Sequence, residues 1–406
     1  MTKTHQSRTI KQMDSLGIYV SVPFCRSKCT YCNFASGVFP ASYFERYVHR
    51  LREDLDGMRA RTAKWNAQLP DQVDSIYLGG GTPSLLPAAL IKRLFTAIRE
   101  AFAVNADAEV TIECAPGQLE EETLGAMIEC GVNRISFGVQ SFVDAEAKQT
   151  GRLHTRDIAL LDVERVRQTG IARLNLDLIA GLPGQTRATW RESLDVLRDA
   201  APDHASVYML EVDDESRLGK EISAGGFRYY ASQVPSDDLI AEMYVEAEEF
   251  FAVNGMPQYE ISNFSRCGAE SRHNLKYWTR QPYLGFGLDA HSMLRDTDGR
   301  ALRFAATDEL EPFLNDAGWE DPQPLSFEDE LEEAWFLGLR LNRGVSLSAL
   351  EADFGGKPVR HFNSVISELV KEGLIECCEK HVKLTSRGRL FSNEVFARFL
   401  REPVSA

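Results

Sequence analysis

The sequence lacks several features that would assign its class at once. No apolar run reaches the roughly 18 residues needed to cross a bilayer, so we expect no membrane-spanning segment. Basic residues are in the minority, with 45 Lys and Arg against 60 Asp and Glu, a net charge of −15. Such an acidic chain does not favour non-specific binding to nucleic acid, which depends on a positive surface. Short repeats are also missing, and 44% of the residues are hydrophobic, which together argue against collagen, coiled coil and disorder.

Secretion signals are scarce too. The first 14 residues hold no apolar stretch of the kind that a secretory signal needs. An organellar presequence is the less favoured alternative, because the segment is poorly amphipathic. Only eight of the 406 residues are cysteines, too few for a small disulfide-stabilised domain. We therefore expect a globular, cytoplasmic protein of two or three domains.

Short β-branched runs alternate with helical patterns from residue 17 to about residue 253. Six strand–helix units in succession predict a parallel sheet with right-handed crossovers. Because six is two fewer than a closed eight-stranded barrel needs, we expect an α/β fold built as a partial (β/α)6 barrel. The expected strands are residues 17–22, 75–78, 108–112, 134–138, 174–179 and 205–210.

The rest of the chain has three regions that differ in composition. An aromatic, histidine-bearing extension is followed by an acidic connector and then by helices, a predicted hairpin at 374–384 and a last helix. This C-terminal part is expected to be a winged-helix-like α+β domain. Its last 50 residues carry nine basic and six acidic residues, so a packing or lid role is favoured over DNA binding. The predicted segments are 1–253 (barrel), 254–308 (extension), 309–324 (connector) and 325–406 (C-terminal domain).

The strongest chemical signal follows the first expected strand, where Cys25, Cys29 and Cys32 have the spacing CxxxCxxC. Three thiolates in one loop can hold a [4Fe-4S] cluster and leave one iron open for a substrate or cofactor. A structural zinc site would need a fourth ligand, and no His or Cys nearby supplies one. The remaining cysteines match no ligand pattern, although the adjacent Cys377 and Cys378 could bind a metal.

Together with the GGGTP loop of residues 79–83, the cysteine loop resembles the radical S-adenosylmethionine (SAM) superfamily. In that family the open iron binds the amino and carboxylate groups of SAM, and an electron from the cluster cleaves it. The resemblance therefore implies a [4Fe-4S] cluster, SAM, and an electron donor such as flavodoxin or ferredoxin. Three glycines also let the backbone approach a ligand closely and present N–H groups to it.

The resemblance assigns roles to further residues. It places Tyr19 and Tyr31 beside the cluster and the methionine part of SAM, and Gly80, Gly81 and Thr82 at its amino-acid end. The other positions that match SAM-binding residues, some of them for a second SAM, are Glu113, Gln140, Arg152 and Asp177. The alternative for the two carboxylates is burial with backbone N–H partners. For Gln140 and Arg152 the alternative is that both residues persist in a protein that has lost the second SAM site.

Further motifs, in residues 112–117, 134–142, 151–154 and 175–186, resemble the HemN/HemW branch of this superfamily. That branch contains oxygen-independent coproporphyrinogen III oxidases and haem chaperones. Phe34 stands where the oxidases have a fourth cysteine, and HNxxYW at residues 273–278 is implied to be a chaperone signature. Only 24 residues precede Cys25, fewer than in the oxidases. The resemblance thus implies haem binding and transfer to an acceptor protein. The alternatives are a true oxidase and, less favoured, a DNA-binding regulator with an Fe–S sensor.

Candidate haem residues are His273 and Tyr277 in HNxxYW, and His291. A neutral imidazole is a good axial ligand of haem iron, and aromatic rings pack against a porphyrin face. The alternative for each histidine is a hydrogen-bonded residue of the core. Haem itself is implied by the resemblance and not by the spacing of these residues.

Overall fold

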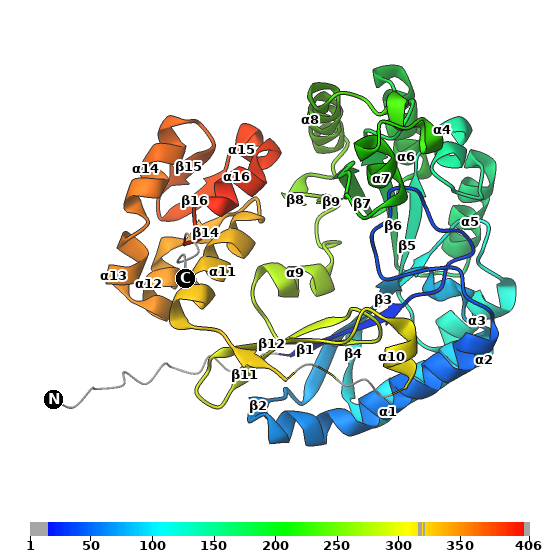
Figure 1. Ribbon diagram of the computed structural model, residues 1–406, viewed down its shortest axis with the longest axis horizontal. Coiled ribbons are helices and arrows are strands. Elements are labelled where there is room, and N and C mark those ends of the chain that lie inside the picture. Colours follow the sequence, from blue (N-terminus) through cyan, green and yellow to red (C-terminus); the bar gives the residue numbers. More distant parts are fainter. Residues whose placement is uncertain (1–14, 316–318, 320, 402–406) are drawn as a thin grey trace.

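The computed structural model describes residues 15–315, 319 and 321–401. Its centre is a twisted sheet in which six neighbouring strands run parallel (Figure 1). These strands, in spatial order, are β1 (Leu16–Val22), β3 (Gln72–Gly80), β4 (Ala103–Cys114), β5 (Arg134–Gln140), β6 (Arg173–Ala180) and β7 (His204–Met209). All six were predicted, which confirms the partial parallel barrel.

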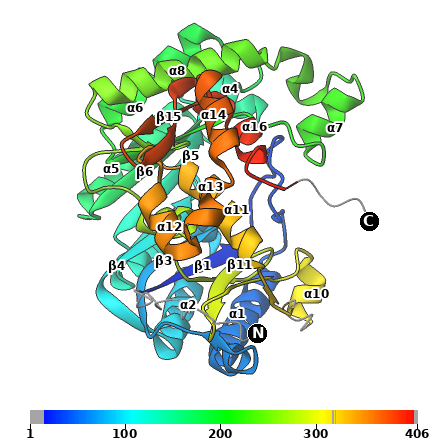
Figure 2. The ribbon, with the colours of Figure 1, turned by 90° about the vertical axis from the view of Figure 1, so that its left-hand side faces the viewer.

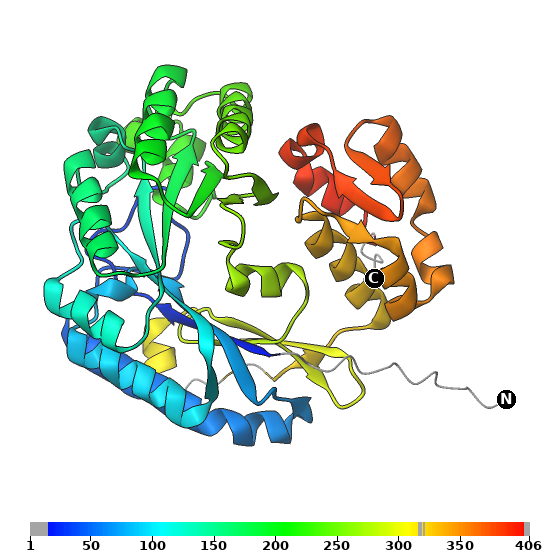
Figure 3. The same cartoon turned by 180° about the vertical axis from the view of Figure 1, so that it is seen from behind.

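Helices cover the convex side of this sheet (Figures 1 and 3). They are α1 (Ser42–Lys64), α2 (Ala88–Ala101), α3 (Glu121–Glu129), α4 (Asp144–Gln149), α5 (Arg156–Gln168) and α6 (Arg187–Ala200). The apolar stripe of α2 is buried, with Leu94, Phe95 and Ile98 at 1% exposure or less. After β7 follow α7 (Arg217–Ser223), a short 3-10 segment (Arg228–Gln233) and α8 (Asp237–Val253).

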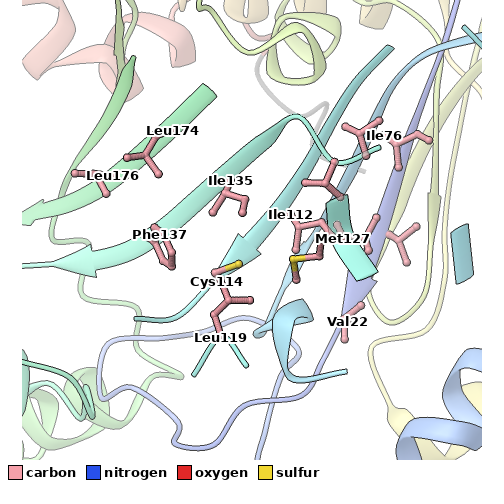
Figure 4. Packing of buried hydrophobic residues seen from close by; sticks show 14 of the residues in the cluster. Val22, Ile76, Ile112, Cys114, Leu119, Met127, Ile135, Phe137, Leu174 and Leu176 are labelled. Atoms are coloured by element: carbon pink, nitrogen blue, oxygen red, sulfur yellow. The ribbon is translucent and has the colours of Figure 1, made fainter. Parts of the chain in front are cut away.

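The two faces of the strands differ in chemistry. Residues of the convex face are apolar and pack under the helices, as Ile76, Ile112, Ile135 and Leu174 do in Figure 4. The concave face is polar, because side chains alternate along a strand and the intervening residues include Ser, Glu, Asn and Asp. A closed eight-stranded barrel fills its interior with branched apolar side chains. This partial barrel instead keeps a polar interior.

The sheet continues at both edges with strands that were not predicted. Beyond β7 lie β9 (Asn263–Ser265) and β8 (Gln258–Glu260), and beyond β1 lies the parallel strand β10 (Tyr283–Phe286). Antiparallel strands complete this second edge: β11 (His291–Asp296), β12 (Ala301–Ala305), β13 (Gln323–Pro324) and β2 (Ala67–Gln68). Most of these runs span only two to four residues and so give little periodic signal, whereas β11 and β12, with six and five residues, were missed although they are no shorter than some of the predicted strands. Between the two edges, helix α9 (Arg272–Trp278) lies on the concave side (Figures 1 and 3).

The C-terminal part has its own apolar core around Trp335, Phe399 and Val382. The predicted hairpin is confirmed as β15 (Ile375–Cys378) and β16 (His381–Leu384), joined by β14 (Val345–Ser346) in a three-stranded sheet. The surrounding helices are α11 (Phe327–Leu339), α12 (Leu347–Phe354), α13 (Gly356–Arg360), α14 (Asn363–Lys371), α15 (Ser386–Leu390) and α16 (Ser392–Ala397). This confirms an α+β part of winged-helix type (Figure 2).

A short backbone link joins this part to the sheet. Ile261 donates its N–H to the carbonyl of Arg340 at 3.2 Å, and Glu260 bridges to Leu341. Before it, the predicted connector includes α10 (Leu310–Leu314), whereas residues 316–318 and 320 lie outside the described residues, as do the first 14. The four segment boundaries stay predictions. Over the described part of the chain, no helix is long and apolar enough to cross a membrane.

Candidate active site

A cavity of about 950 Å³ lies at the carboxyl edge of the parallel strands, between the cysteine loop and the C-terminal part. Arg340, Leu390 and Glu394 of the C-terminal part belong to its wall. Most of the residues predicted from the sequence also line it: Cys25, Cys29, Tyr31, Cys32, Gly80, Gly81, Thr82, Glu113, Gln140, Arg152 and Asp177. The fold therefore gathers residues from five strand ends around one space.

The cysteine loop is shaped by its own backbone. Cys25 donates its N–H to the carbonyl of Gly37 at 2.8 Å, and Lys28 Nζ donates to the carbonyl of Phe34 at 2.6 Å. Cys25, Cys29 and Cys32 form no disulfide and are partly exposed, and burial raises the pKa of the Cys25 thiol. Within the described ranges, no three His, Cys, Asp or Glu side chains are grouped tightly enough to hold a single metal ion. Three ligands of a cubane need not converge in that way, since each binds a different iron.

The glycine loop needs residues without a Cβ, because it packs closely against neighbouring backbone. A Cβ on Gly81 would lie 2.8 Å from the carbonyl oxygen of Phe24, and Gly80 has a φ of +101°. The N–H of Gly81 bonds to Val22 and that of Thr82 to Phe24, both at 2.8 Å. The expectation that the three glycines offer free N–H groups to a ligand is therefore wrong for Gly81, and the N–H of Gly80 is bonded to Glu113. What the glycines supply is close approach to the cysteine loop.

Two carboxylates face the cavity. Glu113 accepts a hydrogen bond from Tyr77 at 2.7 Å and one from the N–H of Gly80 at 3.2 Å. Burial raises the pKa of Glu113 to about 7, and nearby Asp177 adds to the shift. Asp177 accepts from Asn175 at 2.7 Å and from Ser136 at 3.3 Å, and burial raises its pKa as well. Because desolvation disfavours the charged form of both carboxyl groups, a bound cation would stabilise that form.

Gln140 and Arg152 are incompletely paired. Gln140 is a buried non-glycine residue with a φ of +72°, a conformation that costs about 1–2 kcal/mol. Among the described residues, its Oε1 and the Nε of Arg152 are buried without a hydrogen-bond partner. Gly138 makes room for them, because a Cβ there would lie 2.7 Å from Arg152 Nη2. Strain and unpaired polar atoms at one place are typical of a ligand site.

The other candidates lie outside the cavity. Tyr19 lies on the concave face with its ring 6.1 Å from that of Tyr77. His273 is buried, with Nδ1 3.0 Å from Ser75 Oγ and Nε2 2.8 Å from the hydroxyl of Tyr277. Burial lowers its pKa to about 3, so the imidazole is neutral. His291 has a side chain that is 71% exposed, 3.8 Å from Asp289. The haem roles of His273, Tyr277 and His291 stay predictions.

Sequence reasoning missed Tyr77 and the residues from the C-terminal part. Tyr77 is two residues before Gly79 in a strand, so the period of two already placed it on the concave face. Arg340 and Glu394 come from a remote part of the chain, and no local pattern indicates that they reach this cavity.

Comparisons with known proteins agree with this architecture. Residues 19–197 match the radical SAM superfamily, and residues 325–391 match the HemN C-terminal domain. A protein named heme chaperone HemW from Bacillus subtilis is 34% identical over 387 residues, covering 95% of this chain and 99% of its own length. HemW of Lactococcus lactis is 31% identical over 390 residues, covering 95% and 98%.

Coproporphyrinogen III oxidase (HemN) from Escherichia coli has the same fold, with a TM-score of 0.80 over 95% of this chain and 90% of that one, at 24% identity. That likeness shows the fold alone. The identity to the two HemW proteins, which extends over nearly the whole of each chain, shows in addition that the chain belongs to the HemN/HemW branch of the radical SAM superfamily.

Proposed function

We propose that the chain is a haem chaperone, which binds a [4Fe-4S] cluster, SAM and haem and passes haem to an acceptor protein. The observation that carries this proposal is the end-to-end similarity to proteins named heme chaperone HemW, combined with Phe34 at the position of the fourth cysteine of the oxidases. In the structure Phe34 lies at the cavity with 62% of its surface exposed.

The residues present fit a cluster with SAM. Cys25, Cys29 and Cys32 would hold three irons, and their thiols border the same cavity as Glu113 and Asp177. When bound, such a cluster supplies an open iron for the amino and carboxylate groups of SAM and an electron for its cleavage. The protein's own part is to bind and orient. Two carboxylates would attract the permanently positive sulfonium, and the glycine loop packs closely against the cysteine loop at the wall of the same cavity.

The haem site is proposed from the names of the relatives and from three candidate residues. Of the candidate ligands, His291 is open to solvent, whereas both ring nitrogens of His273 already have partners. A haem bound through His273 would have to displace either Ser75 or Tyr277. A haem bound through His291 would need no such rearrangement.

The deciding experiment compares two activities in one anaerobically reconstituted sample. The protein is incubated with SAM, a reductant and coproporphyrinogen III, and separately titrated with haem. We expect no decarboxylated product, together with a saturable change in haem absorbance at one haem per chain or fewer. Turnover of coproporphyrinogen III would make the protein an oxidase and overturn the proposal. Failure to bind haem, in a sample that still cleaves SAM, would also overturn it.

A further inference from the structure

Helix α9, which carries the HNxxYW motif, is fixed to three strands on the concave side of the sheet. At its beginning, the carboxylate of Glu109 in β4 accepts the N–H of His273 at 3.2 Å. In its first turn, His273 Nδ1 lies 3.0 Å from Ser75 Oγ in β3. Near its end, Lys276 Nζ lies 2.8 Å from Asp74. Gly17 in β1 allows this approach, because a Cβ there would lie 2.7 Å from Lys276 Cδ. The helix therefore has one position relative to the strands.

One line of contacts runs from α9 to Glu113. The imidazole of His273 packs on the ring of Tyr77 with 5.5 Å between centroids, and the hydroxyl of Tyr77 donates to Glu113 at 2.7 Å. Gly79 keeps this contact close, since a Cβ there would lie 2.9 Å from Tyr77 Cε1 and 3.0 Å from Glu113 Oε1. Tyr19 packs against both Tyr77 and His273. The carboxylate of Glu113 is thus held by Tyr77, whose ring is fixed by Tyr19 and His273.

A second line of contacts runs from the N-terminus of α9 to Asp177. Its hydrogen bonds are Ser271 N to Tyr259 OH at 3.2 Å, Tyr259 OH to His204 Nε2 at 2.9 Å, His204 Nδ1 to Asn175 Oδ1 at 2.6 Å, and Asn175 Nδ2 to Asp177 Oδ1 at 2.7 Å.

The direction of this chain is fixed by its chemistry. Burial holds the pKa of His204 well below its usual range, so the ring is neutral and donates from only one nitrogen. Because Asn175 Oδ1 can only accept, Nδ1 of His204 donates and Nε2 accepts from Tyr259. In this series of four hydrogen bonds every donor therefore points toward Asp177. Successive bonds then polarise one another and favour the charged form of its carboxyl group.

We propose that α9 is the positioning element of the SAM site, acting on Glu113 through Tyr77 and on Asp177 through His204 and Asn175. This inference rests on the proposed binding of SAM near these carboxylates. It gives the HNxxYW motif a role inside the protein. His273, Tyr77 and His204 are positioning residues, since each acts on the ligand through another side chain.

The test uses Tyr77→Phe, which removes one hydroxyl and keeps the ring. The matched control is Tyr283→Phe, because the hydroxyl of Tyr283 accepts from Arg303 at 2.7 Å and its ring touches Tyr277 on the other side of α9. With equal cluster content, the dissociation constant for SAM is measured by calorimetry at pH 7. We expect about tenfold weaker binding for Tyr77→Phe, from the loss of one hydrogen bond to a charged group, and no change for the control.

The pH dependence separates positioning from general damage. The groups that face Glu113 come from six places around it: Tyr77 and the Gly80 N–H from β3, Asp177 from β6, Tyr19 from β1, Tyr208 from β7, Tyr277 from α9, and Arg152. The hydrogen bond from Tyr77 lowers the pKa of Glu113, so its loss raises that pKa further and leaves less carboxylate at pH 7. The deficit of Tyr77→Phe should therefore shrink as the pH is raised to 9. A deficit that is constant with pH would contradict the proposal, as would wild-type affinity at every pH.

A second variant, His273→Gln, distinguishes this role from haem ligation. As a positioning residue, it should weaken SAM binding severalfold and leave haem binding unchanged, while His291→Gln leaves SAM binding unchanged. Loss of haem binding with wild-type SAM affinity would overturn the inference and make His273 a haem residue. If the wild-type protein with an intact cluster does not bind SAM at all, the proposed function itself fails, a result that the variants alone could not produce.

Discussion

The two ends of the space inside the sheet differ in what their polar side chains contact, an open cavity at one end and a packed helix at the other. At the carboxyl edge, the described residues leave Gln140 Oε1 and Arg152 Nε buried without a hydrogen-bond partner. At the amino edge, His273 bonds through both ring nitrogens and Lys276 forms an ion pair with Asp74. An unpaired buried polar group costs about 1–3 kcal/mol, so the carboxyl edge is maintained at the expense of stability.

This difference indicates that the carboxyl edge binds ligands and that the amino edge has a structural role. Ligand groups can complete the unpaired atoms of the carboxyl edge, which is also the edge at which the loops of α/β barrels carry their chemistry. At the amino edge, contacts from α9 to β1, β3 and β4 hold the strands in register, although Glu109 Oε2 and Trp278 Nε1 are also buried there without a hydrogen-bond partner. Loss of a cluster ligand at the first end should abolish binding and leave the fold intact, whereas loss of a buried ion pair at the second end should mainly lower stability.

The largest effect is expected from Cys25→Ser at the carboxyl edge. A cluster ligand is lost, so the reconstituted protein should lose its iron, its sulfide and the visible absorbance of the cluster, while far-ultraviolet circular dichroism stays unchanged. The matched control is Cys267→Ser, because Cys267 is exposed and lies outside the cavity. Wild-type iron and sulfide content in Cys25→Ser would remove this cysteine from the cluster.

At the amino edge, Lys276→Met should mainly lower stability. Lys276 is 2% exposed and Asp74 26%, so the substitution leaves a mostly buried carboxylate without its cation. We expect the free energy of unfolding to fall by about 3 kcal/mol, measured by urea denaturation of the cofactor-free protein. The double variant Lys276→Met/Asp74→Asn should recover part of that loss. If the single variant is as stable as the wild type, the amino edge does not have the structural role assigned to it.

How much of this contrast could be predicted depends on the distance along the chain. The six parallel strands follow from local β-branched runs, and the residues at their carboxyl ends follow from where those runs stop. The second partner of β1 could not be predicted in the same way, because β10 lies more than 250 residues later and is only four residues long. The place of α9 inside the sheet depends on Glu109, Ser75 and Asp74 from other strands, which no local pattern connects to it.

Glu113→Gln tests the carboxyl edge through the pH dependence of the free energy of unfolding. The folded-state pKa of Glu113, about 7, is above the ordinary value near 4.5 that the unfolded chain keeps. The stability contributed by the protonated group is therefore full below about pH 4.5 and is lost as the pH rises through 7. In the cofactor-free protein, Glu113→Gln should be the more stable chain above pH 7, by up to about 3 kcal/mol, and nearly equal to wild type at pH 4.5. Parallel stability curves for the two proteins would show that Glu113 is not held at the expense of stability. SAM binding should nevertheless weaken in the variant, because the charge is lost.

The smallest effect on the fold is expected from Phe34→Cys, which restores the cysteine pattern of the oxidases at the rim of the cavity. Phe34 is 62% exposed, so the free energy of unfolding should change by no more than about 0.5 kcal/mol. Cluster content and SAM cleavage should stay at wild-type levels, because Cys25, Cys29 and Cys32 are unchanged. Coproporphyrinogen III should still not be turned over, since the rest of the cavity, including its wall from the C-terminal part, is as before. Oxidase activity gained by this one substitution would mean that residue 34 alone separates the two activities, and that the carboxyl edge of this chain is already built for the oxidase reaction.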